Sequence, residues 1–353
     1  MEHHPLNRLW TAGLVALCLL AAGCAQSPSR SSTSTADLVV EEFMIPGADP
    51  GVQLYVRNKR SRSLTSFKPD NIVLFVHGGT YPSETGFDLR LEGWSWMDYM
   101  AARGFDVYMV DIRGFGKSSR PLEMEQPPDA NGPIVNTATA ARDYGAAVDF
   151  IRARRGVDKI NALAHSWGCS ITATFTSQNN AKVNRLVLFA PQWIRTRTLT
   201  DPGGAKLGAY RTVTVDAARK RKETGLAPGR NPMPDAWFEA WVKETFDSDP
   251  KGATASPKYV RAPNGVIQDN RDFWLVGKPI YDPAAIRVPT LVIVGEWDAD
   301  TPIDTVQAMF PKLVNAAPKR LVIVGEATHS LMLEKNRMQL FREVQTFLEE
   351  ARD

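Results

Sequence analysis

A serine flanked by small residues follows a short apolar run in the middle of the chain. The run Ile160 to Ala164 has the composition of a strand buried on both faces, and the segment AHSWG, from Ala164 to Gly168, leads from it into a helical pattern. A sharp strand-to-helix turn needs small residues two positions before and two positions after Ser166, because larger side chains would collide. Such a turn would raise the Ser166 hydroxyl above the sheet edge, beside helix N–H groups that favour negative charge. Ser166 could therefore be a nucleophile; a serine that only caps the helix is the alternative.

Histidine is the side chain best suited to accept a serine proton near neutral pH. The chain has five histidines, of which two lie among the first four residues. His77 precedes two glycines, and His165 adjoins the serine, where we expect its side chain to point away. His329 therefore remains as the candidate general base, shortly after Leu321–Val324, the last strand that the sequence predicts.

Three carboxylates follow the run Leu291 to Val294, which is the strand expected before the last one. They are Glu296, Asp298 and Asp300, in a segment that reaches Pro302. A carboxylate that accepts a hydrogen bond from the imidazole would hold the ring in the tautomer that can take the serine proton. A hydroxyl, an imidazole and a carboxylate arranged in this way can attack a carbonyl carbon and form a covalent acyl intermediate.

These residues need a scaffold that brings distant segments to one edge. Apolar, β-branched runs alternate along the chain with helical patterns, the clearest of which is Thr137 to Arg155. This alternation predicts an α/β fold with a parallel sheet and crossover helices. Two earlier runs, Val39 to Ile45 and Val52 to Arg57, flank a turn-rich hexamer and predict a hairpin at the sheet edge. The other predicted strands are Ile72–Val76, Val107–Ile112, Ile160–Ala164, Leu186–Phe189, Leu291–Val294 and Leu321–Val324.

The alternation is interrupted once, from Trp193 to Ile286. No strand-like run appears there, and the sequence predicts helices over Ala205 to Thr224 and Asp235 to Asp247, followed by a loop rich in proline and glycine. The interruption is longer than a connection needs. We expect a helical cap over the carboxyl ends of the strands, where open α/β sheets bind ligands. Aromatic residues would give the cap an apolar surface or hold it together: Trp237, Phe238, Trp241, Phe246, Phe273 and Trp274.

The segment around Ser166 resembles the nucleophile elbow of the α/β-hydrolase superfamily, Gly-x-Ser-x-Gly, with Ala164 in place of the first glycine. The resemblance covers about residues 39–347, apart from the cap. It implies an α/β-hydrolase fold, with a mostly parallel central sheet, an antiparallel amino-terminal edge and a helical cap inserted before the penultimate strand. It also implies a catalytic triad of Ser166, Asp298 and His329, in the chain order of the superfamily.

The same resemblance assigns the acid and the oxyanion donors. The family pattern Gly-x-x-Asp before a proline selects Asp298; Asp300 is the second candidate, and a helix or turn cap is the simpler interpretation of it. The loop HGGT, which starts at His77, resembles the family's His-Gly loop, whose following backbone N–H faces the developing negative charge. Here that N–H belongs to Gly79, and the second donor would be the N–H of Trp167, directly after the nucleophile. His77 itself is expected to be a structural hydrogen bonder.

The resemblance implies hydrolysis of an acyl substrate. A serine nucleophile argues against epoxide hydrolases and haloalkane dehalogenases, whose nucleophile is an aspartate. We expect a carboxylic-ester hydrolase for small to medium apolar esters, because esters are the commonest substrates of the superfamily. One alternative is an amidase or aminopeptidase that resembles proline iminopeptidases, and another is a catalytically silent surface lipoprotein that only binds ligands. In the aminopeptidase, cap carboxylates would hold the substrate ammonium, the candidates being Asp235, Glu239, Glu244, Asp269 and Asp272.

The composition excludes several other classes. The 353 residues are 43% hydrophobic and 23% charged, which is a globular composition. The 42 basic and 39 acidic residues give a net charge of +3, too balanced for a nucleic-acid partner bound through its phosphates. No metal or cofactor is expected, since the remaining histidines and cysteines form no ligand cluster. The expected partner is a small-molecule acyl substrate, and the sequence does not determine the oligomeric state.

The amino terminus has the pattern of an export signal. The run Leu9 to Ala22 lies behind Arg8 and is too short for a transmembrane helix of about 20 residues. It ends in the segment LAAGC, which resembles a bacterial lipobox with Ala21 where leucine is usual. This resemblance implies lipidation of Cys24 and a membrane-anchored lipoprotein exported from the bacterial cytoplasm. Ordinary cleavage nearby, with an incidental Cys24 and a soluble periplasmic or secreted product, is the alternative.

The predicted organisation combines these patterns. Residues 1–23 form a signal peptide, 24–37 a flexible tether, 38–192 and 287–353 the hydrolase core, and 193–286 the cap. Cys169 has no partner within the mature chain and is expected to be a small buried packing residue, rather than a redox-sensitive neighbour of the serine. In the cap, the basic cluster Arg219 to Lys222 is expected to be a solvated helix face, with attraction of anionic substrates or lipid headgroups as the alternative.

Overall fold

The computed structural model describes residues 37–195 and 204–350. The predictions on the signal peptide and on Cys24 lie outside these residues, as does nearly all of the predicted tether. The division into a core and a cap stays a prediction, and the name "cap" is kept below for residues 204–286.

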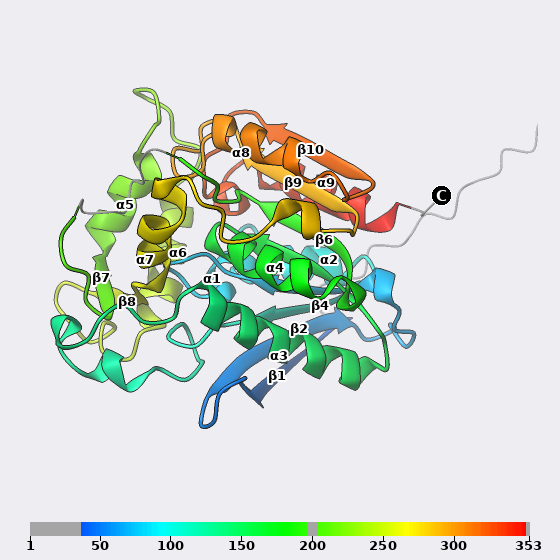
Figure 1. The fold of residues 1–353 in the computed structure, drawn as a ribbon, viewed down its shortest axis with the longest axis horizontal. Coiled ribbons are helices and arrows are strands. Elements are labelled where there is room, and N and C mark those ends of the chain that lie inside the picture. Colours follow the sequence, from blue (N-terminus) through cyan, green and yellow to red (C-terminus); the bar gives the residue numbers. More distant parts are fainter. Residues whose placement is uncertain (1–36, 196–203, 351–353) are drawn as a thin grey trace, which may run out of the picture. The chain divides into compact units, whose positions relative to one another are not determined.

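Eight strands form one sheet in the order β1-β2-β4-β3-β5-β6-β9-β10 (Figure 1). The first two strands of this order run antiparallel to each other, and β2 is antiparallel to β4, whereas all pairs from β4 to β10 are parallel. The predicted mostly parallel sheet with an antiparallel amino-terminal edge is therefore confirmed. The strands are β1 (Leu38–Pro46), β2 (Gln53–Ser61), β3 (Ile72–Val76), β4 (Asp106–Val110), β5 (Ile160–His165), β6 (Val183–Phe189), β9 (Thr290–Gly295) and β10 (Lys319–Val324).

Helices cover both faces of this sheet, because its central strands are apolar on both sides. In β3, Ile72, Leu74 and Val76 belong to one buried cluster, and Val73 and Phe75 belong to the other. The first cluster includes side chains of α3, α4 and α8, and the second includes side chains of α2 and α9. The helices of the core are α1 (Ser83–Phe87), α2 (Trp96–Ala101), α3 (Thr137–Arg155), α4 (Trp167–Gln178), α8 (Ile303–Met309) and α9 (Arg337–Glu349).

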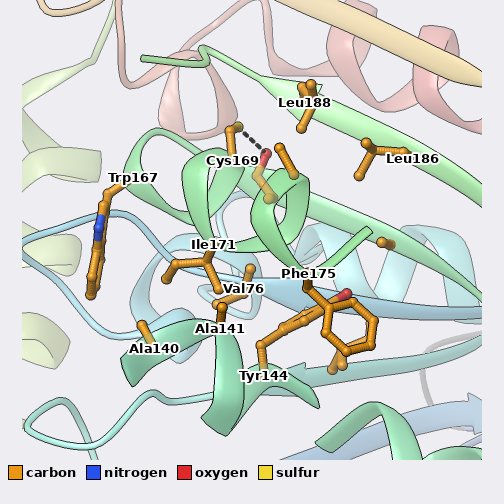
Figure 2. Packing of buried hydrophobic residues seen from close by; sticks show 14 of the residues in the cluster. Val76, Ala140, Ala141, Tyr144, Trp167, Cys169, Ile171, Phe175, Leu186 and Leu188 are labelled. Carbon is orange, nitrogen blue, oxygen red and sulfur yellow. Dashed lines mark hydrogen bonds between the residues drawn. The ribbon is translucent and has the colours of Figure 1, made fainter. Parts of the chain in front are cut away.

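The helix after Ser166, α4, is held against α3. Tyr144 of α3 meets Phe175 of α4 edge to face, with ring centroids 5.5 Å apart (Figure 2). The indole N–H of Trp167 donates to Thr137 Oγ1 over 2.8 Å, at the first turn of α3. Cys169 is fully buried in the same cluster, as predicted, and burial raises the pKa of its thiol. These contacts with α3 hold α4 in position, including its first turn next to Ser166.

The cap lies between β6 and β9 and contains two strands, so the prediction of a strand-free segment was wrong. The strands β7 (Tyr210–Thr214) and β8 (Tyr259–Pro263) pair antiparallel, and α5 begins only after β7 (Figure 1). The physical reason is the β-branched run TVT in β7, which favours a strand but is only half-buried and so lacks an apolar pattern. The cap helices are α5 (Val215–Glu223), α6 (Asp235–Asp247) and α7 (Gly265–Asp272), of which α6 has the predicted bounds.

The cap packs onto the core through aromatic side chains of α6. Phe238, Trp241 and Phe246 are buried and belong to the same apolar cluster as α2 and α9. Trp241 meets Tyr81, in the loop after β3, edge to face at a centroid distance of 4.7 Å. These rings therefore hold the cap in place on the core.

Candidate active site

Ser166 lies on a strained turn between β5 and α4. Its backbone has φ 58° and ψ −123°, a conformation that residues other than glycine rarely adopt. A Cβ on Gly168 would lie 2.5 Å from the carbonyl oxygen of His77 and 2.8 Å from that of Val76, so a larger residue would collide with the end of β3. The Ser166 side chain makes no capping hydrogen bond within the described part of α4. The helix-cap alternative thus finds no support.

The acid and the histidine are in direct contact. His329 Nδ1 lies 2.8 Å from Asp298 Oδ2, and Asp298 is 4% exposed. The same carboxylate accepts hydrogen bonds from the backbone N–H of Asp300 (2.9 Å) and from the N–H and hydroxyl of Thr301 (both 2.7 Å). An aspartate held by these donors accepts the Nδ1 proton of the imidazole, which leaves Nε2 free of a proton. The pair is therefore suited to accept a proton at Nε2.

Ser166 and His329 line one pocket, together with the loop after β3. This loop runs against the serine, since a Cβ on Gly78 would lie 3.0 Å from Ser166 Cβ and 3.4 Å from its Oγ. Among the residues that the structure describes, no acceptor takes the backbone N–H of Gly79 or of Trp167. The structure thus places Ser166, His329 and Gly79, which lie far apart in the sequence, in the lining of one pocket.

Of the other two histidines of the described chain, His77 is buried and His165 is half-buried, and the pKa of each is lowered. His77 contacts the Gly78 carbonyl oxygen through Nδ1 (2.6 Å) and accepts the Ile112 N–H at Nε2 (3.1 Å), which fits the predicted structural role. Burial lowers the pKa of His77 to about 4, against the opposing effect of its bond to Gly78. Since both ring nitrogens are engaged, His77 is not available as a proton acceptor.

His165 does not point away from the site, so that expectation was wrong. Its Nε2 lies 2.9 Å from the carbonyl oxygen of His329, and its ring lines the pocket. The reason is strand periodicity: His165 shares a face of β5 with Leu163, and the loop that carries His329 packs on this face. Burial, and then the neighbouring His329, lowers the pKa of His165 well below its usual value. A neutral His165 can donate to the His329 carbonyl and support the position of that residue.

Asp300 is neither a helix cap nor a turn cap in the described chain. Its carboxylate forms an ion pair with Arg221 of α5 at 2.9 Å. Burial by itself would raise the pKa of Asp300, but the charge of Arg221 and other nearby cations outweighs it and holds the pKa at about 2. Asp300 thus joins the cap to the loop that carries Asp298.

The basic cluster of α5 is only in part a solvated face. Lys220 is exposed, but Arg221 and Lys222 are half-buried and line the pocket. Lys222 Nζ donates to Ser330 Oγ over 3.0 Å and lies 4.2 Å from the centre of the Trp241 ring. Helical spacing was the signal that could have predicted this half-burial. Arg221 and Lys222 follow the buried Ala218 by three and four positions and so share its helix face.

A second cap arginine, Arg211 of β7, reaches the loop after β3. Its Nη2 donates to the Gly79 carbonyl oxygen (2.7 Å) and to Thr80 Oγ1 (3.0 Å), and Arg221 donates to the same hydroxyl over 3.2 Å. Burial lowers the pKa of Arg211 to about 10. Sequence reasoning missed this residue because it missed the strand that carries it.

Two further features concern the described residues as a whole. None of their helices is long and apolar enough to cross a membrane. None of their histidine, cysteine, aspartate and glutamate side chains form a group of three or more that could hold a metal ion.

The family described as the alpha/beta hydrolase fold matches residues 71–336 of the chain. Among solved structures, a serine hydrolase involved in carbazole degradation is similar, with 19% identity and a TM-score of 0.59 over 88% of this chain and 99% of that one. A 2-hydroxy-6-oxo-6-phenylhexa-2,4-dienoate hydrolase from Rhodococcus has 17% identity and a TM-score of 0.58 over 88% and 100% of the two chains. A thermophilic esterase from Thermogutta terrifontis has 16% identity and a TM-score of 0.55 over 87% and 98%. None of the curated proteins compared with the sequence matches it. At these low sequence identities the structural similarities support the fold alone. This fold is the α/β-hydrolase fold that was predicted from the sequence.

Proposed function

Because the chain belongs to the alpha/beta hydrolase fold family, we propose that it is a serine hydrolase that cleaves carboxylic esters of small to medium size. The observation that carries the proposal is one pocket that holds the Ser166 hydroxyl on a strained turn and the imidazole of His329, whose Nδ1 is bound to Asp298. Ester cleavage is ranked first because esterases from Thermogutta terrifontis and Exiguobacterium antarcticum are among the structures with this fold.

The proposed mechanism assigns one role to each of these groups. Ser166 Oγ attacks the carbonyl carbon of the ester while His329 Nε2 takes the hydroxyl proton. Asp298 stabilises the imidazolium that forms, and the same proton then goes to the departing alcohol. Negative charge collects on the carbonyl oxygen, where the backbone N–H groups of Gly79 and Trp167 stabilise it, each by roughly 3 kcal/mol in the transition state. Water, activated by His329, then hydrolyses the acyl-enzyme and frees Ser166.

The lining of the pocket supports a mainly apolar substrate. Phe87, Trp241, Met332 and Leu333 surround the space next to the serine. A substrate that is apolar next to its scissile bond would pack against these side chains.

The aminopeptidase alternative finds no support in the pocket. It requires a carboxylate from the cap to hold the substrate ammonium, but none of the five candidates is among the residues that line the described pocket. Asp235 is exposed and pairs with Arg219, and Asp269 accepts the N–H of Thr137. The charged cap residues that do line the pocket are cations, which would repel an ammonium group.

Hydrolysis of aryl esters and of amino-acid anilides by the wild type and by Ser166→Ala tests the proposal. We expect faster ester turnover, a loss of at least about a thousandfold in Ser166→Ala, and covalent labelling of Ser166 by a fluorophosphonate. Ser170→Ala is the matched control, since Ser170 is buried one turn later on α4 and does not line the pocket. Faster anilide turnover would favour the amidase, and folded protein without ester turnover or labelling would favour the silent binding protein.

We also propose that the protein is exported and anchored to a membrane through a lipid on Cys24. The support is the sequence alone, namely the apolar run and the lipobox-like segment that ends at Cys24. Mass spectrometry of the mature amino terminus tests this proposal. A diacylglycerol-modified Cys24 is expected, and a mature protein with an unmodified Cys24, or with an amino terminus beyond it, would contradict the anchor.

A further inference from the structure

The wall of the pocket that the cap contributes carries a charge that the proposed chemistry does not use. Arg221 and Lys222 line the pocket, whereas no aspartate or glutamate is among its described lining residues. The acyl mechanism requires the serine, the histidine and two backbone donors, and it requires no lysine. The two cations therefore need a separate explanation.

The two cations differ in their partners. Arg221 is neutralised by Asp300, with which it forms an ion pair at 2.9 Å. Lys222 Nζ has a neutral partner, Ser330 Oγ, and the face of the Trp241 ring; within the described residues no carboxylate oxygen lies within 4.0 Å of it. Lys222 is thus a half-buried cation in an apolar pocket without an opposite charge in contact.

The two described carboxylates whose charges act on Lys222 are Glu334 and Asp300, and both are occupied by other donors. Glu334 accepts hydrogen bonds from the backbone N–H and the hydroxyl of Thr328. Asp300 forms its ion pair with Arg221. Neither can turn to the lysine without giving up these bonds, so neither of them is free to neutralise Lys222.

Burial changes the pKa of the Lys222 amine. It lowers the pKa of Lys222 to about 7, with the charge of Glu334 opposing the shift and that of Arg221 adding to it. A cation is costly in a pocket of low polarity unless an anion accompanies it. An anionic ligand group would therefore bind more strongly here than at an exposed lysine, because little water competes for the ammonium group.

We propose that Lys222 binds a carboxylate of the substrate, so that the esters cleaved at Ser166 carry one negative charge in addition to the scissile ester. The proposal rests on the proposed function and adds the substrate class to it. We prefer a carboxylate to a phosphate monoester on grounds of charge. Of the two described cations that line the pocket, only Lys222 lacks a carboxylate partner, so the second negative charge of a phosphate monoester would remain uncompensated. Ser330 directly follows His329, so the bound carboxylate would lie on the histidine side of the pocket.

Two pairs of substrates test this proposal, each differing only in a carboxylate and its neutral amide. In para-acetoxybenzoate and para-acetoxybenzamide the group lies on the alcohol side, and in the para-nitrophenyl esters of adipate and adipamate it lies on the acyl side. The ratio of kcat/KM for the anionic over the neutral member is measured in the wild type, Lys222→Met, Lys222→Arg and Lys220→Met. The last variant removes the same charge from the exposed side of α5.

We expect the wild type to favour the anionic member of at least one pair, and Lys222→Met to lower that ratio by about tenfold or more, as for loss of a hydrogen bond between charged groups. Lys222→Arg should keep most of the preference, and Lys220→Met should keep all of it. A wild type without preference in either pair, an unchanged ratio in Lys222→Met, or an equal fall in Lys220→Met would each overturn the proposal.

A binding experiment separates this proposal from the proposed function. The binding of para-acetoxybenzoate and para-acetoxybenzamide to Ser166→Ala, with and without Lys222→Met, is measured by calorimetry. If no ester is cleaved in a Ser166-dependent manner, the proposed function fails. The carboxylate site is then still supported by tighter binding of the anion that depends on Lys222, and it is overturned by equal binding of the two ligands.

Discussion

The pocket has two walls that are built in different ways. On the core wall, Ser166, Asp298 and His329 follow the ends of β5, β9 and β10, strands of one hydrogen-bonded sheet. On the cap wall, Arg221 and Lys222 extend from α5, a helix of nine residues, and reach the core through a few side-chain contacts. The sheet register determines the relative positions on the core wall, whereas a few side chains position the cap wall. The difference suggests that the core wall supplies the chemistry and the cap wall the choice of substrate.

The two walls are joined by arginines. Arg211 and Arg221 both donate to Thr80 Oγ1 in the loop after β3, and Arg221 also pairs with Asp300 in the loop after β9. The cap therefore contacts both the loop that carries the proposed oxyanion donor Gly79 and the loop that carries the acid. Changes in the cap should affect turnover to a smaller degree than changes in the core wall.

The largest expected effect is the difference in kcat between substitutions at Asp298 and at Asp300, the two aspartates of the loop after β9. Asp298→Asn should lower kcat by about ten thousandfold, because an amide no longer holds the imidazole in the required tautomer. Asp300→Asn should lower it by less than about tenfold, since Asp300 contacts the cap and not His329. Both variants are assayed with the same aryl ester. The reverse order would assign the catalytic acid to Asp300 and break the contrast between the walls.

The rigidity of the core wall is tested at Gly168. Gly168→Ala should lower the free energy of unfolding by about 1–3 kcal/mol, because its Cβ would meet the backbone oxygens of Val76 and His77 at the end of β3. Gly132→Ala is the matched control and should change stability by less than about 0.5 kcal/mol, since no described atom lies within 4 Å of a Cβ built there. Urea denaturation measures both. Equal stability of the two variants would mean that the turn is less tightly packed than its geometry indicates.

The connection between the walls is tested at Arg211. Arg211→Met should lower kcat by about tenfold, because the Gly79 carbonyl and the Thr80 hydroxyl lose a charged donor and the loop loses its support. Arg211→Lys, which keeps a charged donor, should recover part of the loss. Steady-state kinetics and thermal denaturation are measured on the same samples. A lower melting temperature with unchanged kcat would show that Arg211 stabilises the cap without acting on the site.

The smallest expected effect is a pH dependence of the contact between Arg221 and Asp300. The pKa of Asp300 in the folded chain is about 2, below the usual value of about 3.9, so the carboxylate stabilises the fold above pH 4 and loses this contribution as the pH falls towards 2. The stability advantage of the wild type over Asp300→Asn, about 1 kcal/mol near neutral pH, should therefore shrink between pH 4 and pH 2. Denaturation at a series of pH values measures it. A constant difference would show that the ion pair contributes nothing.

The outcome of sequence reasoning differed between the two walls for a physical reason. The central strands β3, β4, β5, β6 and β9 are buried on both faces along nearly their whole length, and all eight strands of the sheet were predicted with ends within four residues of the observed ones. The helix Thr137–Arg155 was predicted with its observed bounds, as its buried residues recur at helical spacing. In contrast, β7 is half-buried and polar, and its strand conformation depends on pairing with β8, some fifty residues away.

Several features of the site are present in the sequence, since they depend on local sterics and on runs of buried residues. They are the order of Ser166, Asp298 and His329, the small residues around the serine and the strands that precede the three residues. Three other features depend on which elements pack against each other. They are the orientation of His165 towards His329, the pairing of Asp300 with Arg221 and the position of Lys222 over Trp241. Such contacts join residues that are far apart in the chain, and no local pattern encodes them. The sequence by itself therefore determined the scaffold and the candidate catalytic residues, and the tertiary structure decided the charge that the cap presents to a substrate.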